Sequence, residues 1–280
     1  MKTKVSDKKA GPNDGRKVFR KLGTCSRTFF HILNREFGHP KELEERASNV
    51  LAGGIMQKGH QCGILWGASL AIGAEAYRRY GNNDHAINVA IKATQNVMAS
   101  FLQREHTLSC REITRCDFSS KLSFAKYLVS GRFLHCFNLA QHWAPEAVKS
   151  ASQGLSSQES KSQNECLSCA SLVAKKMGAS DEEMIMVAGF AGGLGLSGQA
   201  CGALSAAIWM KSLDRCREDF NNSSIKNAKS KKVLDIFNET TNSKMLCSEI
   251  TGVNFNSLDE HTTFIKNGGC SKLIDTLAKA

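Results

Sequence analysis

Proline is scarce in this chain, at 3 of 280 residues, and runs of β-branched or aromatic residues are few. The chain is instead rich in Ala, Leu, Lys and Glu, and this balance favours helices over strands. Apolar residues also recur at helical spacing in the segments 65–80, 87–101 and 204–213. We therefore predict an all-α fold.

The sequence also lacks any uninterrupted apolar run of 18 residues, so we expect no membrane span. The N-terminal stretch is basic but has no apolar core of a secretory signal, and we therefore expect a cytoplasmic protein. In that reducing compartment, 11 cysteines are more typical of metal ligands, redox centres or buried thiols than of a disulfide framework.

The formal net charge is +11, and the basic residues are dispersed along the chain. No aromatic-interleaved basic stretch, zinc-finger spacing or RNA-binding signature occurs, so we expect no nucleic-acid partner. Solvated helix faces and flexible tails account for most of this charge. An acidic redox partner protein would also be attracted by this positive charge. The oligomeric state stays open, with a homodimer among the options.

The two halves of the chain carry the same motifs in the same order. A Gly-Gly-x₄-Gly loop followed by Cys-Gly occurs at 53–63 and again at 192–202, a shift of 139 positions (192 − 53). CREITRCDF (110–118) likewise aligns with CSEITGVNF (247–255). The repeated glycines, which we predict to approach a bound cofactor, are Gly53, Gly54, Gly59 and Gly63, and Gly192, Gly193, Gly198 and Gly202. The repeated cysteines, our candidate metal ligands, are Cys25, Cys62, Cys110 and Cys136, and Cys166 or Cys169, Cys201, Cys247 and Cys270.

The repeat and the composition together predict the domain organisation. Residues 1–20 are charged and contain helix breakers, which predicts a disordered basic tail. We assign 21–149 to the first domain and 166–280 to the second, with the Ser- and Gln-rich stretch 150–165 as a linker.

The loop glycines and the cysteines suit one kind of chemistry. Glycines allow positive φ and close backbone approach, and a cysteine at a helix start has its thiolate stabilised by free amides. Four thiolates per copy match the ligand count of an iron–sulfur cluster or a zinc site. A glycine-rich turn beside a buried cysteine is the plainer interpretation of the same pattern.

Other residues are weaker candidates. The spacing is not that of a local ferredoxin or zinc-ribbon motif, and the single C-x-x-C, Cys166 to Cys169, would also serve as a dithiol. Cys116 and Cys216 fall outside the repeat, so we expect structural roles for them. No dinucleotide, phosphate-loop or hydrolase motif occurs, and we predict no catalytic residue.

At these motifs the chain resembles the C_GCAxxG_C_C family of redox-active proteins, in two tandem copies. The resemblance is carried by AGGIMQKGHQCGILWG and CREIT in the first copy, and by AGFAGGLGLSGQACGALSA and CSEITG in the second. The segment SCASLVAKKMG resembles the opening cysteine helix of the family and favours Cys169 over Cys166. Ile64 and Ala206 depart from the motif. The family is similar to the non-haem part of split-Soret cytochromes, which implies an iron–sulfur centre bound by the cysteines, [2Fe–2S] or [4Fe–4S].

Our leading hypothesis is therefore a redox protein that uses clustered cysteines to hold an iron–sulfur centre for electron transfer. A metal-free thiol–disulfide protein or sensor is the alternative, and a helical interaction scaffold with buried cysteines is a third. The sequence favours an electron-transfer protein over an enzyme with a substrate of its own.

Overall fold

The computed structural model describes residues 12–156, 165–220 and 224–280. Over these ranges the chain forms fifteen α-helices, three short 3-10 helices and no strand, with one isolated β-bridge between Gln61 and Ser109. The predicted all-α fold is confirmed. None of the described helices is long and apolar enough to cross a bilayer.

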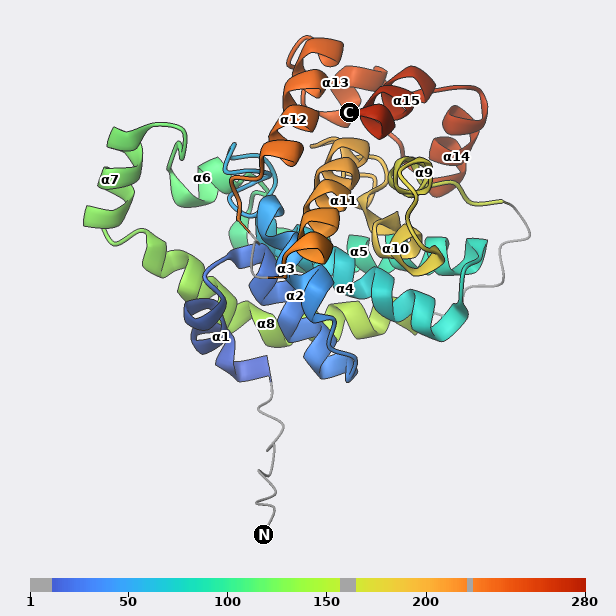
Figure 1. Ribbon diagram of the computed structural model, residues 1–280. Helices are drawn as coiled ribbons and strands as arrows, with labels where there is room; N and C mark the ends of the chain where they lie inside the picture. Colours follow the sequence, from blue (N-terminus) through green and yellow to red (C-terminus); the bar gives the residue numbers. More distant parts are fainter. Residues whose placement is uncertain (1–11, 157–164, 221–223) are drawn as a thin grey trace.

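Seven helices of the first half correspond in order to seven helices of the second half (Figure 1). The first half contains α1 (Gly15–Leu22), α2 (Cys25–Phe37), α3 (Glu42–Ala47), α4 (Gly63–Tyr80), α5 (Asp84–Glu105), α6 (Cys110–Thr114), α7 (Lys121–Val129) and α8 (Phe133–Leu155). The second half contains α9 (Cys169–Lys176), α10 (Asp181–Met186), α11 (Gly202–Glu218), α12 (Ala228–Thr241), α13 (Cys247–Thr251), α14 (Leu258–Lys266) and α15 (Ser271–Lys279). The 3-10 helices are η1 (Pro12–Asp14), η2 (Ser48–Leu51) and η3 (Ala188–Phe190). Helices α2 to α8 thus match α9 to α15, and α1 has no counterpart.

Local sequence signals set several helix starts. The Asn83 side chain accepts a hydrogen bond from the Ala86 amide at the start of α5. Ser180 and Glu183 form a reciprocal capping box at the start of α10. Such caps satisfy amides that have no partner within the helix, and each stabilises its helix by about 1 kcal/mol.

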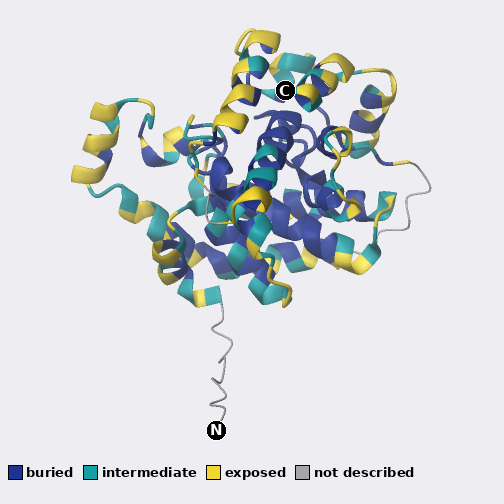
Figure 2. Cartoon of the chain, viewed as in Figure 1, coloured by how far each residue is buried: buried dark blue, intermediate teal, exposed yellow. Residues whose placement is uncertain are grey.

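The two halves pack into one core rather than two. Helices α4 and α11 lie at its centre, and both are buried over most of their surface (Figure 2). Helix α4 packs against α10 and η3 of the other half, while α11 packs against α3 and η2. Because α3 and α10 are equivalent in the repeat, the halves interlock reciprocally. The Trp66 ring meets Phe190 edge-on across this junction, with ring centroids 4.7 Å apart.

The structure differs from the predicted domain organisation at two places. Residues 12–20 of the expected tail form η1 and most of α1, because Val18 and Phe19 are buried against α8. Residues 1–11 lie outside the described part. Helix α8 continues to Leu155, past the predicted start of the linker, since Ala151 and Leu155 are also fully buried. Residues 157–164 of that linker lie outside the described part as well.

Candidate functional site

Each glycine loop forms a left-handed turn of five consecutive residues. Residues 53–57 have φ between 50° and 73°, and residues 192–196 have φ between 55° and 86°. Left-handed backbone is unfavourable for L-residues by about 1–2 kcal/mol each and is normally adopted singly. Ile55, Met56 and Gln57 nevertheless adopt it, as do Leu194 and Leu196. Strain of this kind persists where the surrounding structure holds it, and it is concentrated at functional sites.

The same hydrogen bonds close both loops. The Gly59 amide donates to Gly53 O, and the Gly198 amide donates to Gly192 O, each at 2.9 Å. The loops are also fastened to the following short helix of their own copy. There the Arg111 amide donates to Gly59 O, and the Ser248 amide donates to Gly198 O, each at 3.1 Å. These bonds bring α6 and α13, which open with Cys110 and Cys247, against the loops.

The four repeated cysteines of the first copy converge on one cavity of about 300 Å³. Cys25 opens α2, Cys62 precedes α4, Cys110 opens α6 and Cys136 lies in α8. The remaining wall is mostly apolar and includes several aromatic rings. Ile225 of the second half also lines it.

The second copy brings its four cysteines to one cavity in the same way. Cys169, Cys201, Cys247 and Cys270 line a cavity of about 10 Å³, which is room for about one water molecule. Cys169 therefore occupies the position equivalent to Cys25. Cys166 is buried in the core but is not among the residues that line this cavity.

Backbone amides point at the first cysteine of each set. Burial raises the pKa of Cys25, and the backbone amides of Gly53 and Gly63, which stabilise its thiolate, oppose part of that rise. The thiolate of Cys169 is stabilised in the same way by Gly192 and Ala203. A Cβ atom at Gly63 would lie 2.6 Å from the Cys25 sulfur, so only glycine permits this approach.

The other repeated glycines shape the loop. A Cβ atom at Gly54 would lie 2.4 Å from the backbone nitrogen of His60, and one at Gly193 would lie 2.3 Å from the backbone oxygen of Ala200. At Gly202 a Cβ atom would overlap Phe190 O. These glycines position the cysteines by allowing close backbone approach, and Gly202 also lines the second cavity.

Burial raises the pKa of every thiol in the two sets. The pKa of Cys136 and that of Cys270 rise to about 12. The Cys62 pKa is raised first by burial and then by the neighbouring charges of Cys25, Cys110 and Cys136. Thiolates gathered this closely repel one another, so the set stays protonated at neutral pH unless a positive group offsets the charge.

The thiols surround a space and do not converge on a point. Among the described residues, no three His, Cys, Asp or Glu side chains are placed to hold one metal ion. A structural zinc site requires four ligands at about 2.0–2.3 Å from one ion, and neither set provides that. In an iron–sulfur cluster the thiolates bind several irons, so a cavity with thiols on its wall fits such a group. The first cavity has room for it, whereas the walls of the second would have to separate.

An aromatic group covers each set, and sequence reasoning missed it. Phe118, Phe124 and Tyr127 pack together, with the Phe118 and Tyr127 centroids 5.5 Å apart. At a shift of 137, Phe255 packs against His261 and Phe264, with centroids 5.1 and 5.3 Å away. The sequence did contain a signal for this group, because its residues recur at a shift of 137 positions, which also relates Cys110 to Cys247.

The two aromatic groups differ in their polar atoms. The Tyr127 hydroxyl lies 3.7 Å from the Cys136 sulfur, within hydrogen-bonding range of a thiol, and Phe264 has no such group. His261 donates its Nδ1 proton to Leu167 O at 3.1 Å. Burial lowers the pKa of His261 to about 4, so the ring is neutral near pH 7.

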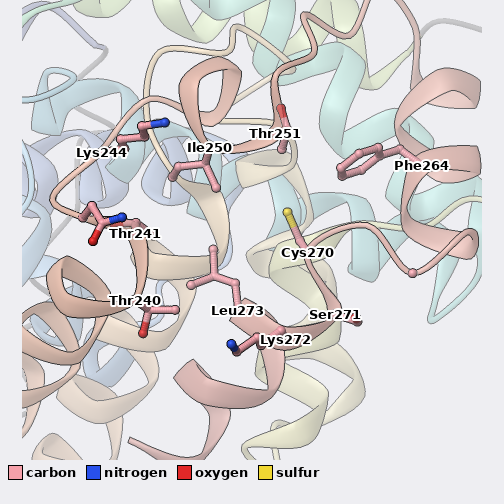
Figure 3. A pocket seen from close by; sticks show the side chains of 12 residues that line it. Thr240, Thr241, Lys244, Ile250, Thr251, Phe264, Cys270, Ser271, Lys272 and Leu273 are labelled. Carbon is pink, nitrogen blue, oxygen red and sulfur yellow. The ribbon is translucent and has the colours of Figure 1, made fainter.

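The second set adjoins an outer groove of about 410 Å³ (Figure 3). Threonines and the lysines Lys244 and Lys272 line this groove. Cys270 lines both the groove and the inner cavity, and its sulfur points toward Thr251 and Phe264. Of the four cysteines of the second set, Cys270 is therefore the one that also lines the outer groove.

The two cysteines outside the repeat are buried. Cys116 accepts a hydrogen bond from the Ser123 hydroxyl at 3.8 Å, and its charge contributes to the raised pKa of Cys110. It therefore lies beside the first set without lining the cavity. Cys216 lies in α11, away from both cysteine cavities.

Fold and site define an all-α protein with two internally repeated four-cysteine sites. Residues 24–175 and 165–280 each match the model of the family described as "Putative redox-active protein (C_GCAxxG_C_C)". The chain belongs to this family and carries two tandem copies of it. No curated protein and no solved structure matches the chain.

Proposed function

We propose that this chain is an electron-transfer protein that holds an iron–sulfur centre in its first cysteine set. The observation that carries the proposal is the convergence of Cys25, Cys62, Cys110 and Cys136 on one apolar cavity of about 300 Å³. Such a cluster, when bound, supplies reversible one-electron chemistry. The chain's part is to hold the thiolates, exclude water and offset their charge.

The surroundings of the first set suit this role. The amides of Gly53 and Gly63 stabilise the thiolate of Cys25, and the start of α4 directs its positive end toward Cys62. Hydrogen bonds to ligand sulfurs and low solvent exposure are among the features that set a cluster's potential. Cys62 and Cys110 are 6% and 4% exposed, so bulk water has little access to either sulfur.

The second set is proposed as a weaker site. It repeats the four thiols and the amide donors, but its cavity of about 10 Å³ cannot admit a cluster unless its walls move. We expect the first set to load before the second.

A metal-free thiol–disulfide protein is less well supported. Reactive thiols have lowered pKa values and partial exposure. Here burial raises the pKa of each thiol in both sets, as for Cys62 and Cys201. A positive metal centre would offset the charge that opposes ionisation.

Iron and acid-labile sulfide measured on anaerobically purified protein test the proposal. We expect both elements, with a visible absorption band that Cys62→Ser removes in whole or in large part. Cys216→Ser is the matched control, because that buried cysteine lies outside both sets. Colourless wild-type protein without iron or sulfide would refute the proposal, as would equal loss in the Cys216→Ser control.

A further inference from the structure

One helix of the first copy stands apart from the body of the molecule. Helix α7 projects from the fold, and most of its surface is exposed (Figures 1 and 2). It nevertheless covers the first cysteine cavity, because Phe124, Tyr127 and Leu128 line that cavity. A protein docked on the outer face of α7 would be separated from the thiols by about one helix width, ~10 Å.

The outer face of α7 is unusually apolar. Leu122 is 82% exposed and Val129 is 91% exposed. Five of the eight exposed large hydrophobic residues of the described chain lie between residues 122 and 134; of these, Phe124 and Leu128 also line the cavity, whereas Leu122 and Val129 do not. Apolar side chains gathered on one exposed face mark interaction surfaces.

The internal repeat provides a comparison within the same chain. Helix α14 occupies the equivalent position in the second copy, and none of its large apolar residues is exposed. It carries Asp259 and Glu260 in its first turn, whereas α7 carries no acidic residue. The exposed apolar face therefore belongs to the first copy and is not a property of the fold.

Charge indicates the kind of partner. Residues 118–145 contain the cations Lys121, Lys126 and Arg132 and no carboxylate. The whole chain has a formal net charge of +11, so a second copy docked here would bring cations to cations. A partner with an apolar contact area and an acidic rim would complement this face.

We propose that the outer face of α7, with Lys121 and Lys126 beside it, docks an acidic electron-carrier protein that exchanges electrons with the first cysteine set. This inference rests on the proposed function. Apolar contact through Leu122 and Val129 supplies affinity, and the cations raise the association rate and orient the partner.

The test uses the full chain, loaded anaerobically with its iron–sulfur centre, and an acidic [2Fe–2S] ferredoxin as the probe. Stopped-flow spectroscopy measures the rate constant of electron exchange at several salt concentrations. We expect the double variant Leu122→Ser/Val129→Ser to slow exchange by about tenfold, as for loss of two contact residues. Lys121→Glu/Lys126→Glu should slow it by about tenfold and reverse the effect of salt.

Lys272→Glu is the matched control. It makes the same kind of substitution once, with half the charge change of Lys121→Glu/Lys126→Glu, at an exposed lysine beside Cys270 of the second copy, and we expect less than a twofold effect. Circular dichroism verifies that all variants are folded. Slowing by Lys272→Glu as large as that by Lys121→Glu/Lys126→Glu would overturn the proposal, because the effect would then come from overall charge.

Calorimetric titration of the metal-free full chain with oxidised ferredoxin separates docking from the redox function. Purified protein that contains no iron would refute the proposed function. The docking proposal would still stand if the α7 variants bind ferredoxin about tenfold more weakly than the wild type does. Absence of binding by the wild type would overturn the docking proposal. Two other results would also overturn it. The wild type could form a dimer, or bind phosphatidylglycerol vesicles, through this face. In either case Leu122→Ser/Val129→Ser would abolish that association and leave ferredoxin binding unchanged.

Discussion

At the scale of single residues, Tyr127 distinguishes the two cysteine sets. Its hydroxyl, 3.7 Å from the Cys136 sulfur, can donate a hydrogen bond that stabilises negative charge on that sulfur. Reduction adds negative charge to a cluster, so this hydrogen bond favours the reduced state and raises the potential. Phe264 takes the equivalent position in the second copy and has no donor.

We predict that Tyr127→Phe lowers the midpoint potential of the first centre by about 30–60 mV, up to a tenfold change in a one-electron equilibrium. Anaerobic redox titration followed by visible absorption measures this shift. Phe264→Tyr is the control and should leave the first centre's potential unchanged. A potential that stays the same in Tyr127→Phe would show that the hydroxyl does not act on the centre.

The buried thiols also predict a pH dependence of stability in the metal-free protein. Burial raises the pKa of Cys136 and of Cys270 from near 9 to about 12. Below pH 9 these thiols are protonated in both folded and unfolded chains. Between pH 9 and 12 only the unfolded chain releases the protons, so stability falls as the pH rises.

Thermal unfolding of the metal-free protein from pH 7 to pH 11 measures this effect. We expect the melting temperature to fall steadily above pH 9, and to fall less steeply in Cys136→Ala. The same slope in wild type and in Cys136→Ala would mean that this thiol ionises equally in both states.

At the scale of structural elements, the left-handed turn is the feature on which the sites depend. Gly54 has a φ of 73°, and a Cβ atom there would lie 2.4 Å from the His60 backbone. Backbone strain and the clash act together in Gly54→Ala, for which we predict a loss of about 3 kcal/mol in the free energy of unfolding. Urea denaturation measures this loss, and iron content should fall with it.

Gly178→Ala is the control for this prediction. Gly178 has a φ of 84°, but a Cβ atom there would meet nothing within 4 Å, so only backbone strain opposes the change, by about 1 kcal/mol. If the two variants lose equal stability, the close approach of Gly54 to His60 contributes nothing.

At this scale the sequence predicted the two glycine loops and the helices that follow them, but not the left-handed turn or the aromatic group. The shift of 139 positions located both loops, and the Cys-Gly pairs opened helices α4 and α11 as expected. The left-handed turn was not predicted, because Ile55 and Met56 are residues that normally avoid positive φ. The aromatic group was missed because Tyr127 and Phe264 differ, and aromatic residues alone are more often part of a core.

At the scale of the whole molecule, the repeat predicted two tandem copies, which the two family matches confirm, and the structure adds that both copies share one core. The sequence pattern could not show this. The apolar faces of α4 and α11 look alike whether they are buried within their own copy or against the other. Helix α4, which follows Cys62, contacts α10 of the second half, and α11, which follows Cys201, contacts α3 of the first half. The geometry of each site thus depends on both copies.

This interlocking predicts that the halves unfold together. At Gly73 of α4, a Cβ atom would lie 2.4 Å from Ile185 O and 2.5 Å from Met186 Cα of the other half. Gly73→Ala therefore forces the halves apart, and we expect a loss of about 3 kcal/mol in the free energy of unfolding.

Hydrogen exchange should rise in α2 and α9 alike, because both belong to one cooperative unit. In Gly252→Ala a Cβ atom meets nothing within 4 Å and only backbone strain of about 1 kcal/mol opposes the change, so exchange in both helices should rise far less than in Gly73→Ala. Faster exchange confined to one half in Gly73→Ala would contradict a single unit. The halves would then be separate domains that share a surface, and each cysteine set would be stable without the other.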